Sequence, residues 1–431
     1  MADFDAIVVG AGCAGSVCAY ELAKAGKNTL VIERGNVAGA KNMTGGRIYT
    51  HSLEKVFPNF REEAPLERKI THEKISLITE DANFTIDFAS DQMKVDGQES
   101  YSVLRGPFDQ WLAQQAEDAG ADFIYGIAVE SLVKDDKGAV IGVKAGDDEI
   151  TAEVVILCDG VNSLLTEQAV GAMRPPASSI AVGVKETIEL PANVITDRVL
   201  TNSDSEGAAW LFSGYSTKGT FGGGFMYTNK ESISLGVVAG IESTMNHGKA
   251  PVYQMLEDFK THEAVAPLIK GGKVVEHSGH MVPEGGINIM PSLVGDGVML
   301  AGESAMMCIN LGYQVRGMDY AVAAGQMAGQ AAVDAINTGD TSAIGLSTYV
   351  SALENSFVLK DLKQFARVPA FMEGFGRMFE GYPEMIRDLA NGLFIVDGTP
   401  VTSLKKKAMP AIKEIGIINV LKDARGAMKA L

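Results

Sequence analysis

The sequence predicts an α/β protein in which a parallel-sheet domain with glycine-rich turns is interrupted by an antiparallel sheet and followed by a helical region. The first observation is an apolar run at residues 4–9 that leads through three glycines into an Ala-rich stretch and a second apolar run at residues 29–33. The second is that apolar runs ending in a glycine turn return at residues 153–160 and 295–305. The third is a change to strand-like patterns between residues 180 and 280.

These observations divide the chain into three parts. We expect the parallel-sheet domain to comprise residues 1–70, 100–172 and 281–350. The antiparallel sheet is expected from residues 71–99 and 173–280, and the helical region from residues 351–431. Because the sequence contains no repeat and no Pro/Ser-rich linker, we expect these parts to be interwoven.

The N-terminal segment reads as strand, turn, helix, strand and acid. Gly10 permits the tight turn, Gly12 lets the backbone approach a pyrophosphate, and Gly15 lets the helix pack close to the strand. The free N–H groups of the helix, which begins near Ala14, would face the phosphates. Glu33, followed by Arg34, ends the second strand, where a carboxylate can accept a hydrogen bond from a ribose hydroxyl. The segment therefore predicts a dinucleotide site, with a glycine-rich connector as the alternative.

The middle of the first domain continues the pattern. A helix is expected to begin in the stretch from Tyr101 to Leu112 and to run to Gly120. Alternating patterns at residues 123–129 and 140–145 suggest a hairpin. Residues 153–157 read as a buried parallel strand that ends in the turn Cys158-Asp159-Gly160.

The second half of the chain shows two further patterns. Residues 181–188, 209–212 and 232–239 read as strands of an antiparallel sheet, interrupted by three glycines at residues 222–224. After the turn at residues 295–305, a long helix of small residues is expected at residues 317–337. Its Gly-x-x-x-Gly spacing indicates tight packing between helices in a soluble domain.

Composition limits the classes of protein. With 46% hydrophobic and 21% charged residues, the chain is typical of a soluble globular protein. We expect no signal peptide, no membrane span and a cytoplasmic location. The net charge of −17 argues against nucleic acid as a partner. The four cysteines have no C-x-x-C spacing and the histidines have no ligand spacing, so no metal is expected.

The last 31 residues differ in charge from the rest of the chain. Residues 401–431 contain seven basic and two acidic residues, so the remaining 400 residues carry a net charge of −22. Apolar residues alternate with these lysines, which permits an amphipathic helix lying on anionic lipid. A C-terminal helix that docks on the body of the protein or on an acidic partner fits the pattern equally well.

The second glycine turn, Gly302-Glu303, identifies a resemblance to the FAD-binding superfamily that includes p-hydroxybenzoate hydroxylase, glutathione reductase and the geranylgeranyl reductases. The resemblance implies an FAD-binding Rossmann-like domain. In that superfamily the second motif usually ends in Gly-Asp, so the extra methylene of Glu303 shifts its contact with the ribityl chain. Asp159 resembles the middle Asp-Gly motif, and Arg105 resembles the arginine that touches the cofactor. A surface turn and a salt bridge at a helix start are the respective alternatives.

The segment after the second turn adds to this resemblance. Leu311, Gly312 and Tyr313 lie where these proteins aim a helix N-terminus at the flavin pyrimidine. A positive dipole end at this place stabilises an anionic reduced flavin.

Three further segments, at residues 39–47, 280–286 and 381–384, resemble the FixC branch of the electron transfer flavoprotein-quinone oxidoreductases. This resemblance spans nearly the whole chain. It implies one FAD, electrons from the subunits of an electron transfer flavoprotein (possibly a bifurcating FixAB-type pair), and a quinone acceptor, menaquinone or ubiquinone. It also implies peripheral contact with the cytoplasmic face of the membrane. Because no cysteine follows Cys308, an iron-sulfur cluster would belong to a separate ferredoxin-like subunit.

The same resemblance suggests catalytic candidates. Lys41, Thr44 and the backbone of Gly45 and Gly46 would lie near the flavin ring, where glycine permits a flat substrate to approach. A simple loop is the alternative. Two further candidates, which frame a quinone entrance or relay its protons unless they are ordinary turn residues, are His280 and Glu284.

Two other functions share the same scaffold. One is a geranylgeranyl-reductase-like or monooxygenase-like flavoenzyme that acts on a small or prenyl substrate. The other is a subunit that keeps FAD only as a folding cofactor in a larger complex. The sequence of residues 183–286 marks no specific small substrate.

Overall fold

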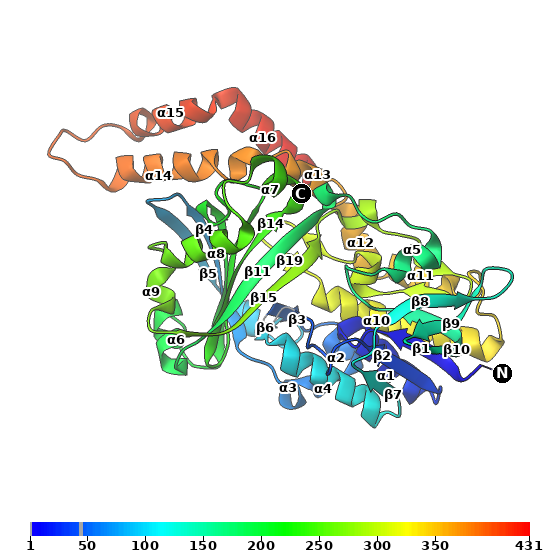
Figure 1. Cartoon of the computed structure of the whole chain (residues 1–431). Coiled ribbons are helices and arrows are strands. Elements are labelled where there is room, and N and C mark those ends of the chain that lie inside the picture. Colours follow the sequence, from blue (N-terminus) through cyan, green and yellow to red (C-terminus); the bar gives the residue numbers. More distant parts are fainter. Residues whose placement is uncertain (1, 43–45) are drawn as a thin grey trace. The chain divides into compact units, whose positions relative to one another are not determined.

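The computed structural model describes residues 2–42 and 46–431. The chain forms two compact units, each assembled from separated segments. The first unit comprises residues 1–67, 95–176 and 281–366, and the second comprises residues 68–94, 177–280 and 367–431. Residues 367–431, which are part of the helical region expected at residues 351–431, cluster with the antiparallel sheet, and residues 351–366 belong to the first unit. Figure 1 shows the elements of both units coloured along the sequence.

The first unit contains a mainly parallel sheet in the strand order β16-β17-β10-β1-β2-β7. The strands β7, β2, β1, β10 and β17 run parallel to one another, and the short β16 pairs antiparallel at the edge. Their bounds are β1 Phe4–Val9, β2 Thr29–Glu33, β7 Asp122–Tyr125, β10 Asp148–Leu157, β16 Val294–Gly295 and β17 Val298–Leu300. Since parallel strands end at one edge, the turns after β1, β2, β10 and β17 share that edge. The predicted α/β class is confirmed.

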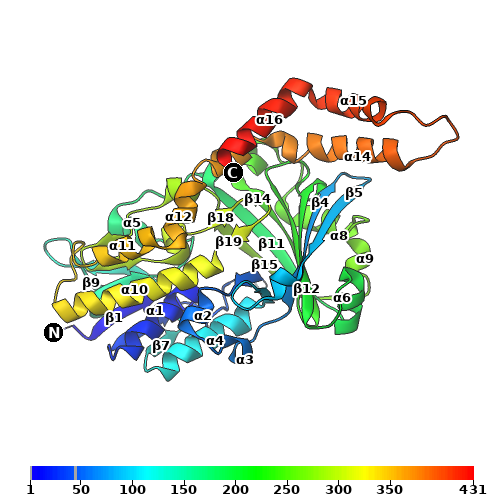
Figure 2. The same ribbon diagram turned by 180° about the vertical axis from the view of Figure 1, so that it is seen from behind.

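Three long helices belong to this unit: α1 Cys13–Lys24, α4 Arg105–Asp118 and α10 Met318–Thr338. Figure 2 shows α10 beside α1. A Cβ atom on Gly325 would lie 2.2 Å from the carbonyl oxygen of Ala14, and one on Gly329 would lie 2.8 Å from that of Cys18. The two glycines therefore set the close approach of α10 to α1, as the spacing predicted.

The remaining elements of the first unit are short. The strands are β3 Gly46–Tyr49, β6 Ser100–Val103, β8 Val129–Lys134, β9 Val140–Ala145, β18 Ile309–Asn310 and β19 Val315–Arg316. The helices are α2 Leu53–Val56, α3 Phe60–Glu63, α5 Leu165–Val170, α11 Ser347–Asn355 and α12 Phe357–Gln364. A core cluster around Phe57, Phe60 and Phe108 packs beneath α1.

The structure corrects the predicted hairpin at residues 123–129 and 140–145. The first of these segments contains β7, which pairs in parallel with β2, and the hairpin partner of β9 is β8. The reason is Gly126, which adopts a φ of +81° and ends β7 before the chain begins β8. The alternating pattern spans this break because both flanking segments are strands.

The second unit contains a sheet in the order β15-β11-β14-β13-β12-β4, with β5 paired to β4. The pairs β4–β5, β11–β14, β12–β13 and β13–β14 are antiparallel, whereas β12 and β4 run parallel. The strand bounds are β4 Lys69–Ile78, β5 Asn83–Ala89, β11 Ile180–Glu189, β12 Glu206–Gly214, β13 Gly222–Thr228, β14 Ser232–Gly240 and β15 Lys273–Pro283. The helices on this sheet are α6 Ala192–Val199, α7 Ile241–His247, α8 Val252–Thr261 and α9 Ala266–Ile269.

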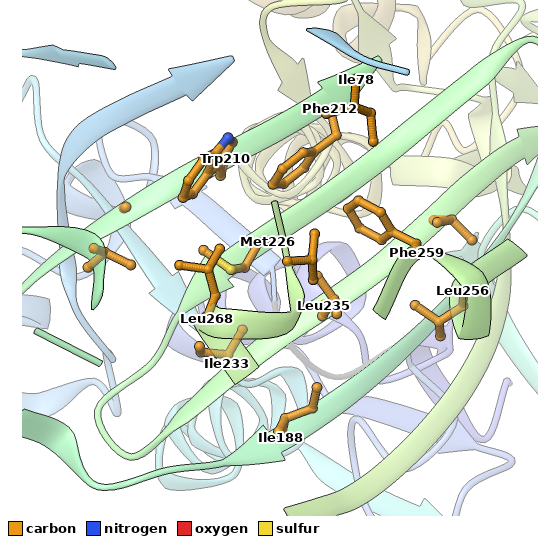
Figure 3. Packing of buried hydrophobic residues seen from close by; sticks show 14 of the residues in the cluster. Ile78, Ile188, Trp210, Phe212, Met226, Ile233, Leu235, Leu256, Phe259 and Leu268 are labelled. Carbon is orange, nitrogen blue, oxygen red and sulfur yellow. The ribbon is translucent and has the colours of Figure 1, made fainter. Parts of the chain in front are cut away.

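Aromatic and aliphatic side chains from β12, β13, β14 and α8 form the core of this unit (Figure 3). Phe212 stacks on Trp210 with ring centroids 5.1 Å apart and meets Phe259 of α8 edge to face at 4.9 Å. Gly224 makes room for that ring, because a Cβ atom there would lie 2.7 Å from Phe259. The glycines at 222–224 thus begin β13, whereas the sequence analysis expected them to interrupt the sheet.

Arg68, at the start of the second unit, is completely buried. Its guanidinium donates hydrogen bonds to the carbonyl oxygens of Ala192, Glu206, Asn229 and Lys230, at 2.7 to 3.2 Å. One arginine therefore connects β4 with α6, β12 and the turn between β13 and β14.

The C-terminal helices α13 Val368–Glu373, α14 Gly381–Phe394, α15 Leu404–Ile415 and α16 Ile417–Ala430 complete the second unit. Asp423 of α16 accepts hydrogen bonds from Arg377 at 2.5 and 2.7 Å and from the Tyr382 hydroxyl at 3.0 Å. Gly426 of α16 faces the ring of Phe371 on α13. The C-terminal helix therefore docks on its own unit, although part of its apolar surface stays exposed.

Candidate functional site

The turn after β1 leaves space in front of the N-terminus of α1. Gly10, with a φ of +98°, backs onto the carbonyl oxygen of Cys158, and a Cβ atom on Gly15 would lie 1.9 Å from the carbonyl oxygen of Gly10. A Cβ atom on Gly12, in contrast, would meet no described atom closer than 3.8 Å. Within the described residues no side chain caps this helix. The free N–H groups and the open space are what a phosphate group requires.

Glu33, at the end of β2, is buried and holds two backbone segments together. Its Oε2 accepts from the N–H of Ala11 at 2.8 Å, and its Oε1 accepts from the N–H of Gly35 at 2.6 Å. The carboxylate therefore lies directly beside the first glycine turn. Arg34 is exposed and lowers the pKa of Asp159 electrostatically, although burial of Asp159 raises that pKa more strongly.

Arg105 begins α4 and lies over the same turn. Its Nη2 is the atom 3.8 Å from the Cβ position at Gly12. Its Nε and Nη2 donate to the two carboxylate oxygens of Asp109 at 2.9 and 2.8 Å. Burial opposes the charge on Arg105, but Asp109 outweighs it, and the pKa of Arg105 is raised. The predicted cofactor arginine thus forms the helix-start salt bridge and also faces the glycine turn.

Asp109 is completely buried and gathers two further donors, the Asn42 side-chain amide and the Cys13 thiol. Burial raises the pKa of Cys13 to about 12, which keeps it a neutral thiol able to donate its hydrogen. The sequence analysis did not single out Asp109. Its spacing of four residues from Arg105 on one helix is a signal that could have found it.

The turns after β10 and β17 are joined by Ser304. The Ser304 hydroxyl donates to Asp159 at 3.0 Å and accepts from the N–H of Gly160 at 2.9 Å. Gly302 packs against Ala14 of α1, where an added Cβ would lie 3.0 Å from the Ala14 methyl carbon. Glu303 stands between Gly302 and Ser304 in the chain, and its carboxylate interacts electrostatically with Arg105. Four predicted motifs therefore converge at the carboxyl edge of the parallel sheet.

The segment from residue 309 to 316 is a small hairpin formed by β18 and β19. Leu311 is buried at its tip, and Tyr313 is 51% exposed. The side chain of Asn310 accepts from the N–H of Gly312 at 2.9 Å and donates to Glu284 at 3.2 Å. The helix N-terminus that the sequence analysis expected here follows directly, because α10 begins at Met318.

Glu284 is partly buried, and its desolvation raises the pKa of the carboxyl group to about 7 although the hydrogen bond from Asn310 lowers it. A carboxyl group with such a pKa can hold or release a proton near neutral pH. Because Asn310 also bonds the backbone of Gly312, the charge of Glu284 is coupled to the β18–β19 hairpin.

The other predicted residues are less informative. Lys41 is exposed, and Gly46 begins β3. Thr44 and Gly45 lie outside the described residues. His280 is half-buried in β15 and belongs to the second unit. The described geometry assigns no catalytic role to Lys41, Gly46 or His280.

A charged network in the first unit was missed by the sequence analysis. Arg316 donates to Asp319 at 2.6 Å and to Asp361 at 2.7 Å, and His51 contacts Asp319 at 3.2 Å. His51 and Asp319 lie 268 residues apart in the chain, and no local pattern signals such a contact. The network fixes the N-terminus of α10, which directly follows the β18–β19 hairpin.

Comparison with known proteins places the chain in a family. The ETF-QO/FixC family C-terminal domain matches residues 368–431, and an FAD binding domain matches residues 3–207. Protein FixC from Escherichia coli O157:H7 is 51% identical over 428 residues, which cover 99% of both chains. The chain belongs to the ETF-QO/FixC family. A second FixC-family relative, the probable electron transfer flavoprotein-quinone oxidoreductase YdiS of Escherichia coli K12, shows the same identity and coverage.

Membership in the FixC family defines the chemistry at a coarse level. The protein is an FAD-dependent oxidoreductase that functions in electron transfer. The open glycine turn and the adjoining Arg105 fit the pyrophosphate of FAD. A geranylgeranyl bacteriochlorophyll reductase-like protein from Thermoplasma acidophilum shares the fold, with a TM-score of 0.71 and 20% identity over 98% of this chain and 99% of that chain. The flavin-dependent halogenase CmlS also shares it, with a TM-score of 0.63 and 17% identity over 96% and 78% of the respective chains.

Across residues 2–42 and 46–431, no group of three or more His, Cys, Asp or Glu side chains is arranged to hold a metal ion. In the same part of the chain, no helix combines the length and apolar character needed to cross a bilayer.

Proposed function

We propose that this FixC-family protein accepts electrons from an electron transfer flavoprotein and delivers them to a membrane quinone. The observation that carries the proposal is 51% identity, over 99% of both chains, to a relative whose name states that reaction. The electron transfer flavoprotein is a bifurcating FixAB-type pair in this proposal. A separate ferredoxin-like subunit carries the iron-sulfur cluster, because the chain has no cysteine after Cys308.

In this proposal, residues at the carboxyl edge of the parallel sheet bind different parts of FAD. The N-terminus of α1 and Gly12 bind the pyrophosphate, together with Arg105. Glu33 is placed for the ribose, and Glu303 for the ribityl chain. When bound, FAD supplies the ability to accept electrons singly and release them as a pair. The hairpin residues Leu311, Gly312 and Tyr313 border the flavin ring in this proposal.

Glu284 supplies the proton chemistry. Reduction of a quinone to a quinol consumes two protons, and a carboxyl group with a pKa of about 7 can deliver one near neutral pH. The bond from Asn310 positions the carboxyl group beside the β18–β19 hairpin. Transfer of the Glu284 proton to the quinone therefore accompanies electron delivery at that hairpin.

The site of action is the membrane surface, because the quinone is dissolved in the bilayer. The protein works at the cytoplasmic face as a peripheral protein in this proposal. The prenyl-reductase and monooxygenase alternatives have support only from the shared fold, at 20% identity or less.

The test is anaerobic mixing of the FAD-loaded protein with a reduced electron transfer flavoprotein, followed by a water-soluble quinone. We expect the flavin absorbance to bleach with the donor and to return with the quinone. Bleaching by NADPH but not by the flavoprotein would overturn the proposal in favour of a substrate-transforming enzyme. A flavin that no donor bleaches would indicate a subunit that keeps FAD only for folding.

A further inference from the structure

The helices α14 and α15 form an antiparallel hairpin in the second unit. Both views show the two helices side by side and joined at one end by the loop of residues 395–403 (Figures 1 and 2). At this end Gly392 of α14 lies beside Lys407 of α15, where an added Cβ atom would make an ordinary contact of 3.8 Å with the Cβ of Lys407. The last turn of α14, the loop and the first turn of α15, residues 393–407, are called the hairpin tip below.

The hairpin tip exposes large apolar side chains. Phe394 is 78% exposed, Val396 85% and Val401 87%. Three other exposed apolar residues of the tip are Leu393, Ile395 and Leu404. A contiguous set of this kind is unusual on the surface of a soluble protein. It marks a site of contact with another protein or with a membrane.

The charges of the tip are almost all positive. Lys405, Lys406 and Lys407 follow the apolar loop, and Asp397 is the tip's one acidic residue. Asp397 accepts hydrogen bonds from the N–H and the hydroxyl of Thr399, at 3.0 and 2.7 Å, so it shapes the turn. The tip therefore carries a net charge of +2 in a chain whose total is −17.

The base of the hairpin is fixed to its unit. Arg387 of α14 contacts Asp81, beside β4, at 3.4 Å. At the other end of α14, Tyr382 bonds Asp423 of α16. The tip is thus the end of the hairpin away from these contacts, and its apolar side chains are exposed in the part of the chain that the structure describes.

We infer that the hairpin tip inserts into the interface of a bilayer that contains anionic phospholipid. Apolar side chains bury in the acyl boundary, and the lysines behind them remain at the level of the phosphate groups. The positive charge alone would suit either anionic lipid or an acidic protein surface. The exposed apolar loop decides for lipid, because its side chains can be buried at the acyl boundary. The inference rests on the proposed function for its purpose, since a quinone reductase must reach the bilayer, but lipid binding can be measured without electron transfer.

The first test is co-sedimentation of the FAD-loaded full chain with vesicles of phosphatidylglycerol and phosphatidylcholine. We expect the double variant Phe394→Ser, Val396→Ser to lose affinity by at least tenfold. The matched control is Ile418→Ser, Met428→Ser, which removes two equally exposed apolar side chains from α16. We expect it to bind within twofold of the natural protein. Unchanged binding of the tip variant would overturn the inference, and both variants are compared by thermal unfolding to verify folding.

The second test places a reporter in the tip. The four native cysteines are buried, so a Val396→Cys variant can be labelled selectively with an environment-sensitive fluorophore. Emission should shift to the blue with phosphatidylglycerol vesicles, shift less in high salt, and stay unchanged with phosphatidylcholine alone. Emission that stays unchanged when phosphatidylglycerol vesicles are added would contradict insertion.

The failure of this inference is distinguishable from failure of the proposed function. The tip variant should keep full flavin bleaching by the reduced electron transfer flavoprotein and full reduction of a water-soluble quinone. A different result would be that the natural protein does not bind vesicles and that the donor no longer bleaches the flavin of the tip variant. In that case the tip binds the donor protein and the lipid inference is wrong. If vesicles bind as expected but no quinone is reduced, the proposed function fails while the inference stands.

Discussion

The buried carboxylate of Asp109 holds the dinucleotide site together at the residue scale. It is the common acceptor for Arg105, Asn42 and Cys13, which come from three separate segments. Burying a carboxylate without a partner costs several kcal/mol, and the three donors offset that cost here. The guanidinium is held over the glycine turn because its Nε and Nη2 both donate hydrogen bonds to Asp109.

We expect Asp109→Asn to destabilise the protein by about 3 kcal/mol, because it removes the charge that Arg105 pairs with in a buried site. The FAD affinity should fall as well, since the guanidinium is no longer fixed. Urea unfolding and flavin titration measure the two effects. The matched control is Glu354→Gln in the exposed pair with Lys363, which should cost less than about 1 kcal/mol. Equal effects of the two substitutions would show that the buried pair contributes no more to the free energy of unfolding than the exposed pair.

Glu284 should make stability depend on pH. Its pKa is about 7 in the folded protein and near 4.5 in the unfolded chain, so the folded state holds the proton more tightly between these values. Stability therefore falls as pH rises from about 4.5 to about 7 and is constant for this group outside that window. Glu284→Gln removes this dependence. Its stability relative to the natural protein should thus be greater at about pH 8 than at about pH 5.

Urea unfolding at the two pH values provides the check on Glu284. Glu414→Gln, at an exposed position of α15, serves as the control and should show the same pH dependence as the natural protein. In the quinone assay, Glu284→Gln should lose an inflection near pH 7. A variant that keeps both the inflection and the stability profile would remove Glu284 from the proton pathway.

At the scale of elements, the contact of α1 with α10 ties the glycine turn to the second half of the chain. Backbone meets backbone at Gly325 and Gly329, where no side chain fits. The N-terminus of α1 is therefore positioned by a helix that follows it by about three hundred residues. The same helix α10 begins directly after the β18–β19 hairpin, so the two ends of the predicted cofactor site share one support.

We expect Gly325→Ala to destabilise the protein by about 1 to 3 kcal/mol and to weaken FAD binding, because the new methyl group must push α1 aside. Gly106→Ala on α4 is a matched control, since no described atom lies within 4 Å of its Cβ position. That control should be neutral or stabilising by up to about 1 kcal/mol. Thermal unfolding with and without FAD measures both. A neutral Gly325→Ala would mean that the two helices are free to separate.

The sequence predicted these elements unequally well. Strand β1, helix α1 and strand β2 follow from local patterns, because apolar runs and glycines act within a few residues. The hairpin of β8 and β9 was misplaced since alternation continues through Gly126. The contact of Asp109 with Asn42 and that of Ser304 with Asp159 were missed because the partners lie more than 60 and 140 residues apart in the chain. Residues such as Arg105 and Asp159 were found only through resemblance to a family.

At the scale of the whole molecule, the two tryptophans offer one reporter for each unit. Trp111 lies in the first unit against Phe57, and Trp210 lies in the second unit, where its indole N–H donates to Ser76 at 2.8 Å. The predicted FAD contacts belong to the first unit. Ligand binding therefore stabilises the two units unequally unless they unfold as one.

We expect FAD to raise the unfolding free energy reported by Trp111 by about 2.7 kcal/mol at a hundred times its dissociation constant. The transition reported by Trp210 should move less. The variants Trp210→Phe and Trp111→Phe isolate the two signals in urea titrations followed by fluorescence. Coincident transitions that move together would show instead that the whole chain unfolds in a single step.

The buried Arg68 also bears on how this protein is made. Of the four carbonyl oxygens described above, that of Ala192 lies nearest in the chain, 124 residues further on. During synthesis, β4 therefore leaves the ribosome with a cation that cannot be buried until its acceptors have been translated. Early compaction of that segment is penalised, since an unpaired buried charge is costly. Burial of Arg68 against these carbonyl groups must therefore wait for the neighbouring segments of the sheet, which delays the compaction of β4 during synthesis.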